Sequence, residues 1–153
     1  MLKTIQQNIE AHLSVEIKSA TRMSGGDISE AYLLTTSGEN LFCKVNHKAN
    51  AEELFEAEKA GLLAIENSQT IKVPKIKFIG KTEEASFLVL EYVEAITATP
   101  KSLQKLGEQL AAMHQCHGET FGWSDNNFIG SLAQANNQHK SWTDFYLLER
   151  LIP

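Results

Sequence analysis

The chain has 153 residues, 42% of them hydrophobic and 22% charged, which is the composition of an ordinary soluble domain. Its formal net charge of -5 argues against a general affinity for nucleic acid or anionic membranes. Cys43 and Cys116 are the only cysteines, too few for a disulfide framework, and the N-terminus lacks the apolar core of a signal peptide. We therefore expect a cytoplasmic protein with neither a nucleic-acid nor a membrane partner.

The first half of the chain predicts a sheet. Residues 2–13 have the periodicity of a short amphipathic helix, expected to cover an edge as a surface helix. Apolar runs separated by glycine-bearing turns or by a helix predict five strands. The expected strands are 15–23, 28–36, 41–46, 76–80 and 87–90, with a helix at 51–66 before the last two. The pattern predicts an α+β fold, a five-stranded antiparallel sheet with one helix packed against it.

The second half predicts helices joined by a long loop. Thr99 is a suitable N-cap with Pro100 at the first helical position, and this helix is expected to reach His117. Residues 118–138 read mostly as loop. Ser141 with Asp144 resembles a capping box that begins a last helix.

Lys44 and Glu58 are two charges in apolar surroundings. Lys44 lies inside the apolar run 41–45, and Glu58 lies on the apolar stripe of the following helix. Burying either charge alone is unfavourable, so each predicts the other as its ion-pair partner. A lysine on a central strand can reach the α- and β-phosphates of a nucleotide while a helix glutamate holds it in place. The alternatives are a lysine reaching solvent from an edge strand and a glutamate on the helix surface.

Two further stretches can contact a nucleotide. Gly25 and Gly26 form either an ordinary hairpin turn or a loop whose backbone N–H groups lie over phosphates. Glu91, Tyr92 and Val93 follow a buried apolar run. The C=O of Glu91 and the N–H of Val93 can present an acceptor and a donor to an adenine edge; the alternative is an ordinary strand end.

Taken together, these motifs give the chain a family resemblance. It is similar to the N-terminal half of a fructosamine (ketosamine) kinase, a family with the protein-kinase-like fold related to aminoglycoside and choline kinases. The shared runs are 25–31, 42–46, 55–58, 90–93, 121–123 and 125–132, followed by Ser141, Trp142, Phe145, Tyr146, Arg150, Leu151 and Pro153. The runs after residue 120 are the ones most specific to this family.

The resemblance implies a kinase that transfers a phosphoryl group from ATP, with Mg²⁺, to the sugar 3-hydroxyl of ketosamines or glycated proteins. It matches Lys44 to the phosphate-binding lysine and Glu58 to its helix partner. The implied cofactor-binding residues are Gly25, Gly26, Lys44, Glu58, Glu91, Tyr92 and Val93. The implied organisation is a nucleotide-binding N-lobe at 1–93, a hinge at 94–98 and the start of a helical C-lobe at 99–153.

The chain departs from the family pattern in two places. The family's catalytic His-Gly-Asp run and its metal-binding Asp have no match, because His117-Gly118 is followed by Glu119 and comes too early. We therefore expect the catalytic Asp and the Mg²⁺ ligands beyond Pro153, and no transfer activity from this chain alone. Asp27 replaces a cysteine that supports redox-sensitive dimers in some relatives, so that switch is not expected here.

Two other functions stay open at this point. One is a non-catalytic interaction module or remnant that self-associates through its apolar last helix. The other is a kinase of the aminoglycoside or choline branch, against which the run at 121–132 argues.

Overall fold

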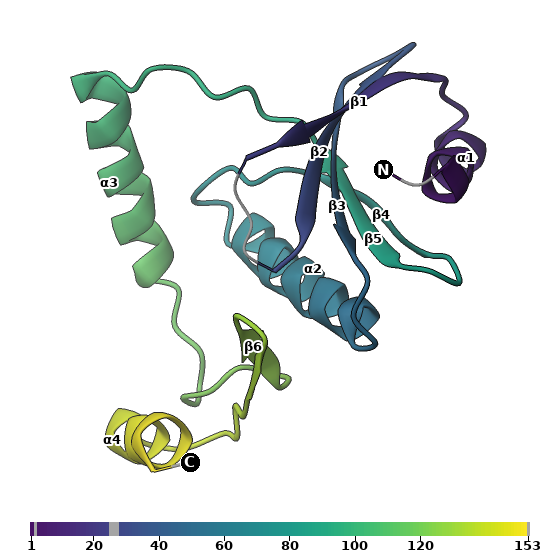
Figure 1. The fold of residues 1–153 in the computed structure, drawn as a ribbon. Helices are drawn as coiled ribbons and strands as arrows, with labels where there is room; N and C mark the ends of the chain where they lie inside the picture. Colours follow the sequence, from purple (N-terminus) through teal and green to yellow (C-terminus); the bar gives the residue numbers. More distant parts are fainter. Residues whose placement is uncertain (2, 25–27, 153) are drawn as a thin grey trace. The chain divides into compact units, whose positions relative to one another are not determined.

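A five-stranded antiparallel sheet in the order β1-β2-β3-β5-β4 dominates the first half of the chain (Figure 1). The computed structural model describes residues 1, 3–24 and 28–152. The strands are β1 Ile17–Met23, β2 Glu30–Thr36, β3 Leu41–Asn46, β4 Ile76–Lys81 and β5 Ser86–Glu91, and the helices are α1 Lys3–Leu13 and α2 Ala51–Asn67. The predicted sheet is confirmed, with each element within two residues of its expected bounds.

The chain divides into two compact units. One contains residues 1–59 and 73–97, and the other contains residues 60–72 and 98–153. The first unit holds the sheet, α1 and the first part of α2. The division into lobes at 1–93, 94–98 and 99–153 stays a prediction.

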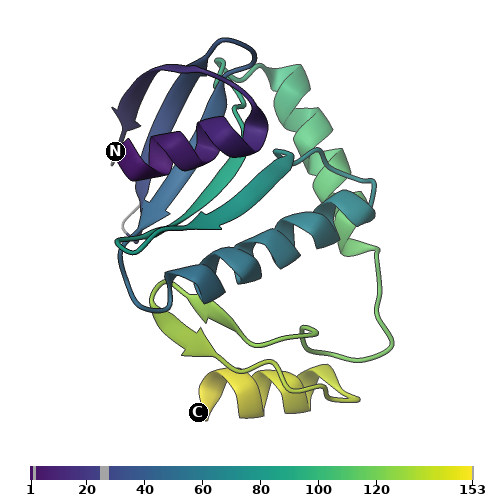
Figure 2. The same cartoon turned by 90° about the vertical axis from the view of Figure 1, so that its right-hand side faces the viewer.

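Helix α1 forms part of the hydrophobic core of the first unit. It runs across the strands (Figure 2, purple), and its Ile5 and Ile9 have no exposed surface. The other buried members of this core are Tyr32, Leu34, Leu41, Cys43, Val45, Ala85, Phe87 and Val89. Most residues of α1 are exposed, as expected of a surface helix, but its buried side reaches beyond the edge strand β4 to the core residues of β2, β3 and β5. Ile5 and Ile9 lie one helical turn apart, and burial of each side chain stabilises the fold by about 1.5–3 kcal/mol. This is enough to hold a short helix on a face of the sheet.

Lys44 lies on the face of the sheet opposite to α1. Since side chains alternate along a strand, Phe42 and Lys44 of β3 point away from the α1 core that holds Cys43 and Val45. In Figure 1 the strands stand between α1 and α2. The sheet therefore has an apolar α1 face and a second face on which Lys44 lies.

In the second unit, α3 spans Pro100–His114 and ends three residues before its predicted limit. Its capping box is complete, because the Thr99 side chain accepts from the Ser102 N–H at 3.1 Å and Ser102 Oγ accepts from the Thr99 N–H at 2.8 Å. The predicted Thr99 cap is confirmed.

The region after α3 is more ordered than predicted. A hairpin of β6 Asn127–Ile129 and β7 Leu132–Gln134 lies within the expected loop and turns at Gly130 (φ 63°). Ser141 caps α4, Trp142–Tyr146, as expected, by accepting from the Asp144 N–H at 3.1 Å. The last helix then widens into a π-helix, η1, Leu147–Leu151, which was not predicted. Among the described residues, no helix is long and apolar enough to cross a membrane.

We predict that any larger residue in place of Gly80 on β4 destabilises the fold. A Cβ at this position would lie 2.2 Å from Cζ of the fully buried Phe87. Gly80→Ala should therefore lower the free energy of unfolding by about 1–3 kcal/mol through overpacking, measured by urea denaturation. Gly61→Ala, in α2 with nothing within 4 Å of its Cβ, is the matched control and should be neutral or stabilising. Equal effects of the two substitutions would contradict this packing.

Cys43 should report on unfolding of the sheet. Burial in the core raises the pKa of the Cys43 thiol to about 12, whereas Cys116 is exposed. In a Cys116→Ser variant, a thiol reagent at neutral pH should react slowly, and the rate should rise with denaturant as the sheet opens. Fast reaction in the native state would show that β3 is not covered by α1.

Candidate nucleotide-binding site

An ion pair between Lys44 and Glu58 is the centre of the candidate site. Lys44 Nζ lies 2.5 Å from Glu58 Oε2, joining β3 to α2. The predicted pairing is confirmed, but both side chains are more exposed than expected, 28% for Lys44 and 32% for Glu58. Glu58 does lie on the same face of α2 as the buried Ala51 and Phe55, but burial does not extend along that face as far as Glu58. A pair this exposed contributes little to stability, about 0–1 kcal/mol, so its value lies in orienting the ammonium.

Apolar residues of the two strands beside β3 flank Lys44. Ala31 of β2 and Leu88 of β5 are its register partners, and both are buried. With apolar neighbours on both sides, the lysine head group has few positions other than along α2 or toward solvent. The arrangement presents one cation at a defined place on a rigid central strand.

Glu91, Tyr92 and Val93, three of the predicted nucleotide-binding residues, lie at or just after the end of β5, the strand next to β3. Glu91 pairs with Leu41 of β3, and its N–H donates to the Lys75 C=O at 2.8 Å. Tyr92 and Val93 follow the strand, and Val93 is exposed. Gly25 and Gly26 lie outside the described residues. The structure thus joins Lys44 to Glu58 and places Glu91 on the adjoining strand, while the contacts of all seven residues with a nucleotide stay predictions.

A buried asparagine beside Lys44 was not predicted. Asn46 is only 3% exposed, and its Nδ2 donates to the Ile28 C=O and to Ser29 Oγ, both at 3.2 Å. Its Oδ1 accepts from the Lys48 N–H at 2.9 Å. The available signal was its position two residues after Lys44, which places both side chains on one face of the strand.

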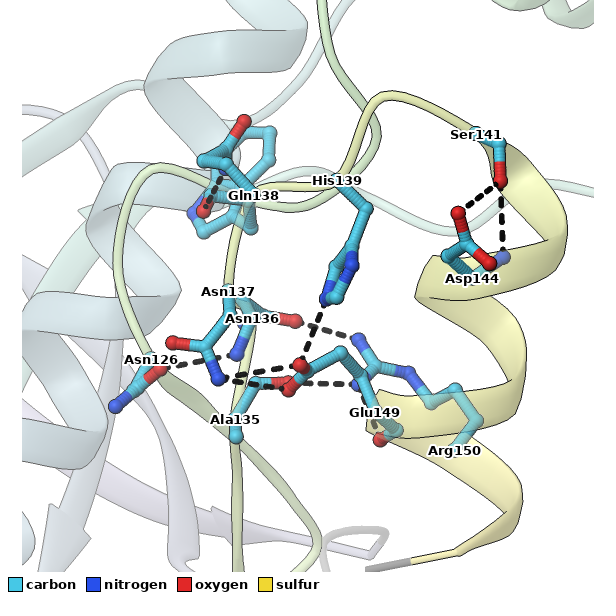
Figure 3. Close-up of polar contacts among 11 residues, drawn as sticks. Asn126, Ala135, Asn136, Asn137, Gln138, His139, Ser141, Asp144, Glu149 and Arg150 are labelled. Atoms are coloured by element: carbon cyan, nitrogen blue, oxygen red, sulfur yellow. Dashed lines mark hydrogen bonds and ion pairs between the residues drawn. The ribbon is translucent and has the colours of Figure 1, made fainter.

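A second polar cluster, also not predicted, lies in the second unit around Glu149 of η1 (Figure 3). The buried Glu149 carboxylate accepts from Asn137 Nδ2 at 3.1 and 3.2 Å and contacts His139 Nε2 at 2.9 Å. The hydrogen bond to His139, followed by the bonds to Asn137, lowers the pKa of Glu149 below its ordinary value of 4.5. The carboxylate is therefore held ionised at neutral pH.

Arg150 completes this cluster from the next position of η1. Its guanidinium donates to the Ala135 C=O at 2.7 Å and to Asn136 Oδ1 at 2.5 Å, and it lies 4.6 Å from the centroid of the Phe145 ring. Asn136 in turn donates to the Asp125 C=O at 2.9 Å. These groups bind one another, and their hydrogen bonds connect η1 to residues 125–139. We therefore interpret the cluster as structural and not as a ligand site.

The described residues offer no group of three or more His, Cys, Asp or Glu side chains that could hold a metal ion. The seven candidate residues include one lysine and two glutamates, of which Glu58 is paired with Lys44. They fit a phosphate anion and do not fit Mg²⁺, so no step through a metal is derived below.

The whole chain, residues 1–153, matches the family model described as fructosamine kinase. The chain belongs to the fructosamine kinase family. It is 34% identical over 99% of its length to a probable ketoamine kinase of Vibrio parahaemolyticus, of which it covers 54%. It is 31% identical over 90% of its length to the ketosamine-3-kinase of Mus musculus, of which it covers 52%. The chain thus spans about half the length of the curated relatives it matches.

Solved structures agree with this assignment. A crystal structure assigned as a fructosamine-3-kinase from Haemophilus somnus superposes with a TM-score of 0.85 at 25% identity, over 96% of this chain and 50% of that one. An aminoglycoside phosphotransferase in complex with AMP-PNP and hygromycin B has a TM-score of 0.59 at 16% identity, over 95% of this chain and 49% of that one, which is a likeness of fold alone. The prediction of a protein-kinase-like α+β fold is confirmed.

Stability of the second unit should depend on the charge of Glu149. Because its pKa is lowered in the folded state, the carboxylate stabilises the fold above pH 4.5 and this contribution is lost as pH falls through the lowered value. Glu149→Gln should therefore unfold more readily than wild type at neutral pH, with a difference that shrinks below about pH 4.5. The two tryptophans, Trp123 and Trp142, both lie in this unit and report the transition by fluorescence. Glu119→Gln, at an exposed site, is the control; a pH-independent difference for Glu149→Gln would contradict the assignment.

Proposed function

We propose that this chain binds ATP through Lys44 and serves as the nucleotide-binding part of a kinase that phosphorylates a sugar hydroxyl of ketosamines. The observation that carries the proposal is the Lys44–Glu58 pair on the central strand of a fructosamine-kinase fold. Membership of the fructosamine kinase family supports the kinase part of the proposal. The substrate and the residues that bind the nucleotide are the proposed parts.

Lys44 has the properties of a phosphate-binding group. An ammonium has three N–H donors, and Glu58 accepts one of them at 2.5 Å. Since the Lys44 side chain is 28% exposed, an anion can approach it from solvent. Glu58 limits the rotamers of the long lysine side chain, so less conformational entropy is lost when phosphate binds.

The adenine is proposed to lie beside the end of β5. There the backbone passes from the sheet into residues 92–99, which have no regular structure. The C=O of Glu91 and the N–H of Val93 are the proposed acceptor and donor for the base edge. Gly25 and Gly26 are proposed to cover the phosphates with backbone N–H groups, which suit anions because no side chain blocks their approach.

The proposed acceptor is the sugar 3-hydroxyl of a ketosamine, either a small glycated amine or a glycated protein. The support comes from relatives named ketoamine kinase and ketosamine-3-kinase, together with the runs at 121–132 and 141–153 that first indicated this branch. A carboxylate that orients the hydroxyl is needed for transfer, and none of the seven candidate residues serves that purpose. We accordingly expect nucleotide binding without phosphoryl transfer from these 153 residues alone.

Replacement of Lys44 tests the proposal directly. Lys44→Ala should weaken ADP binding by about 10- to 100-fold, because a charge-assisted hydrogen bond to phosphate is removed, measured by ligand-observed NMR titration. Its thermal stability should change little, since the exposed ion pair contributes at most about 1 kcal/mol. Lys18→Ala, at an exposed position on β1 of the same sheet, is the charge-matched control. Wild-type affinity no higher than that of Lys44→Ala would refute the proposed role.

A further inference from the structure

We infer that Phe42 contacts the base of the nucleotide and forms, with Leu33 and Leu90, an apolar surface for it beside Lys44. This inference rests on the proposed function, because it adds a base-binding side chain to the same site. Phe42 is not one of the seven cofactor-binding residues predicted from the sequence.

Phe42 lies on the same face of the sheet as Lys44. Side chains alternate along a strand, and the two residues that flank Phe42 in sequence belong to the core that packs on α1. The ring of Phe42 therefore points to the other face, two residues from Lys44 and about 7 Å from it along β3. Its register partners on that face are Leu33 of β2 and Leu90 of β5. Three apolar side chains thus form a row across the middle of the sheet, next to the ammonium.

The pairing of β3 with β5 places Phe42 between the two proposed contacts of the nucleotide. Leu41, the residue before Phe42, pairs with Glu91, whose C=O is the proposed acceptor for the base edge. Glu91 is therefore level with a residue three positions from Lys44, about 10 Å away along the strand. A nucleotide with its phosphates at Lys44 and its base edge at Glu91 extends along this part of β3, so its base lies over Phe42.

Phe42 is open to a ligand although it belongs to a central strand. β3 is flanked by β2 on one side and by β5 on the other. The partial exposure of Phe42 must therefore come from the face of the sheet, on which the partly exposed Lys44 also lies. Leu33 is partly exposed as well, whereas Leu90 is buried. This surface suits a nucleotide, because an aromatic ring can stack with a base while the neighbouring ammonium binds phosphate.

The test separates the two ends of the nucleotide. Phe42→Ala should weaken the binding of adenosine and of ADP by about 5- to 100-fold, the loss typical of removing an aromatic contact with a base. Binding of pyrophosphate, which has no base, should be unchanged. Lys44→Ala should give the reverse pattern, with weaker binding of ADP and pyrophosphate and unchanged binding of adenosine. All three affinities are measured by NMR titration of the full chain.

Phe78→Ala is the matched control. It removes the same ring from β4 of the same sheet, on the α1 face, where Phe78 stacks with His12 of α1. In the folded protein it should leave all three affinities unchanged. An unchanged adenosine affinity for Phe42→Ala, or an equal loss for all three ligands, indicates a merely structural role and overturns the inference.

The failure of this inference can be told apart from the failure of the proposed function. If Lys44→Ala weakens ADP binding while Phe42→Ala leaves adenosine binding unchanged, only the role of Phe42 is refuted. If wild type does not bind ADP, the proposed function fails and this inference fails with it. Should Phe42→Ala not fold, Phe42→Leu keeps an apolar side chain without the ring and should give a smaller loss for adenosine and ADP. The absence of that loss overturns the inference.

Discussion

The ion pair between Lys44 and Glu58 depends on a strand with two different faces. Cys43 and Val45 anchor β3 in the core beneath α1, and their alternation with Lys44 directs the lysine to the opposite face. Ile5 and Ile9 of α1 therefore contribute to the site at a distance, because they belong to the core in which β3 is anchored. The geometry of the cation is a consequence of the packing behind it.

In the second unit, a stretch without regular structure is bound mainly through its side chains to the last helix. Residues 135–139 belong to no regular element except for the isolated bridge of His139 to Phe121. Glu149 and Arg150 are adjacent on η1 (Figure 3). Glu149 contacts the side chains of Asn137 and His139, and Arg150 donates to the Ala135 C=O and to Asn136 Oδ1. A π-helix is rare and usually marks a local requirement; here it occurs where two neighbouring charged side chains both bind that stretch.

The sequence predicted most of the sheet, because strand periodicity and glycine-bearing turns are signals carried by residues that are close together in the chain. It did not predict how deeply α1 is buried, since Ile5 and Ile9 form the same stripe whether a helix covers an edge or a face. The β6–β7 strands escaped detection because three residues are too few to show a period of two. Asn46 was missed for a related reason: an asparagine at a strand end is typical of a turn, and its burial depends on residues 17 and 18 positions away in the chain.

Lys44 and Glu58 are charged residues within apolar stretches of the sequence. Their pairing supports a role in ligand binding more than a role in stability. The prediction assumed deep burial, in which case each charge would have been needed by the other and would have been of little use to a ligand. The two side chains of the observed pair are 28% and 32% exposed, so the desolvation cost is reduced and the stabilisation that the pair can provide is small as well. An ammonium kept in one place, apolar on two sides and open to solvent, gains most when an anion displaces water from it. The partial exposure of Lys44 therefore supports a phosphate-binding role better than the deep burial that the sequence predicted.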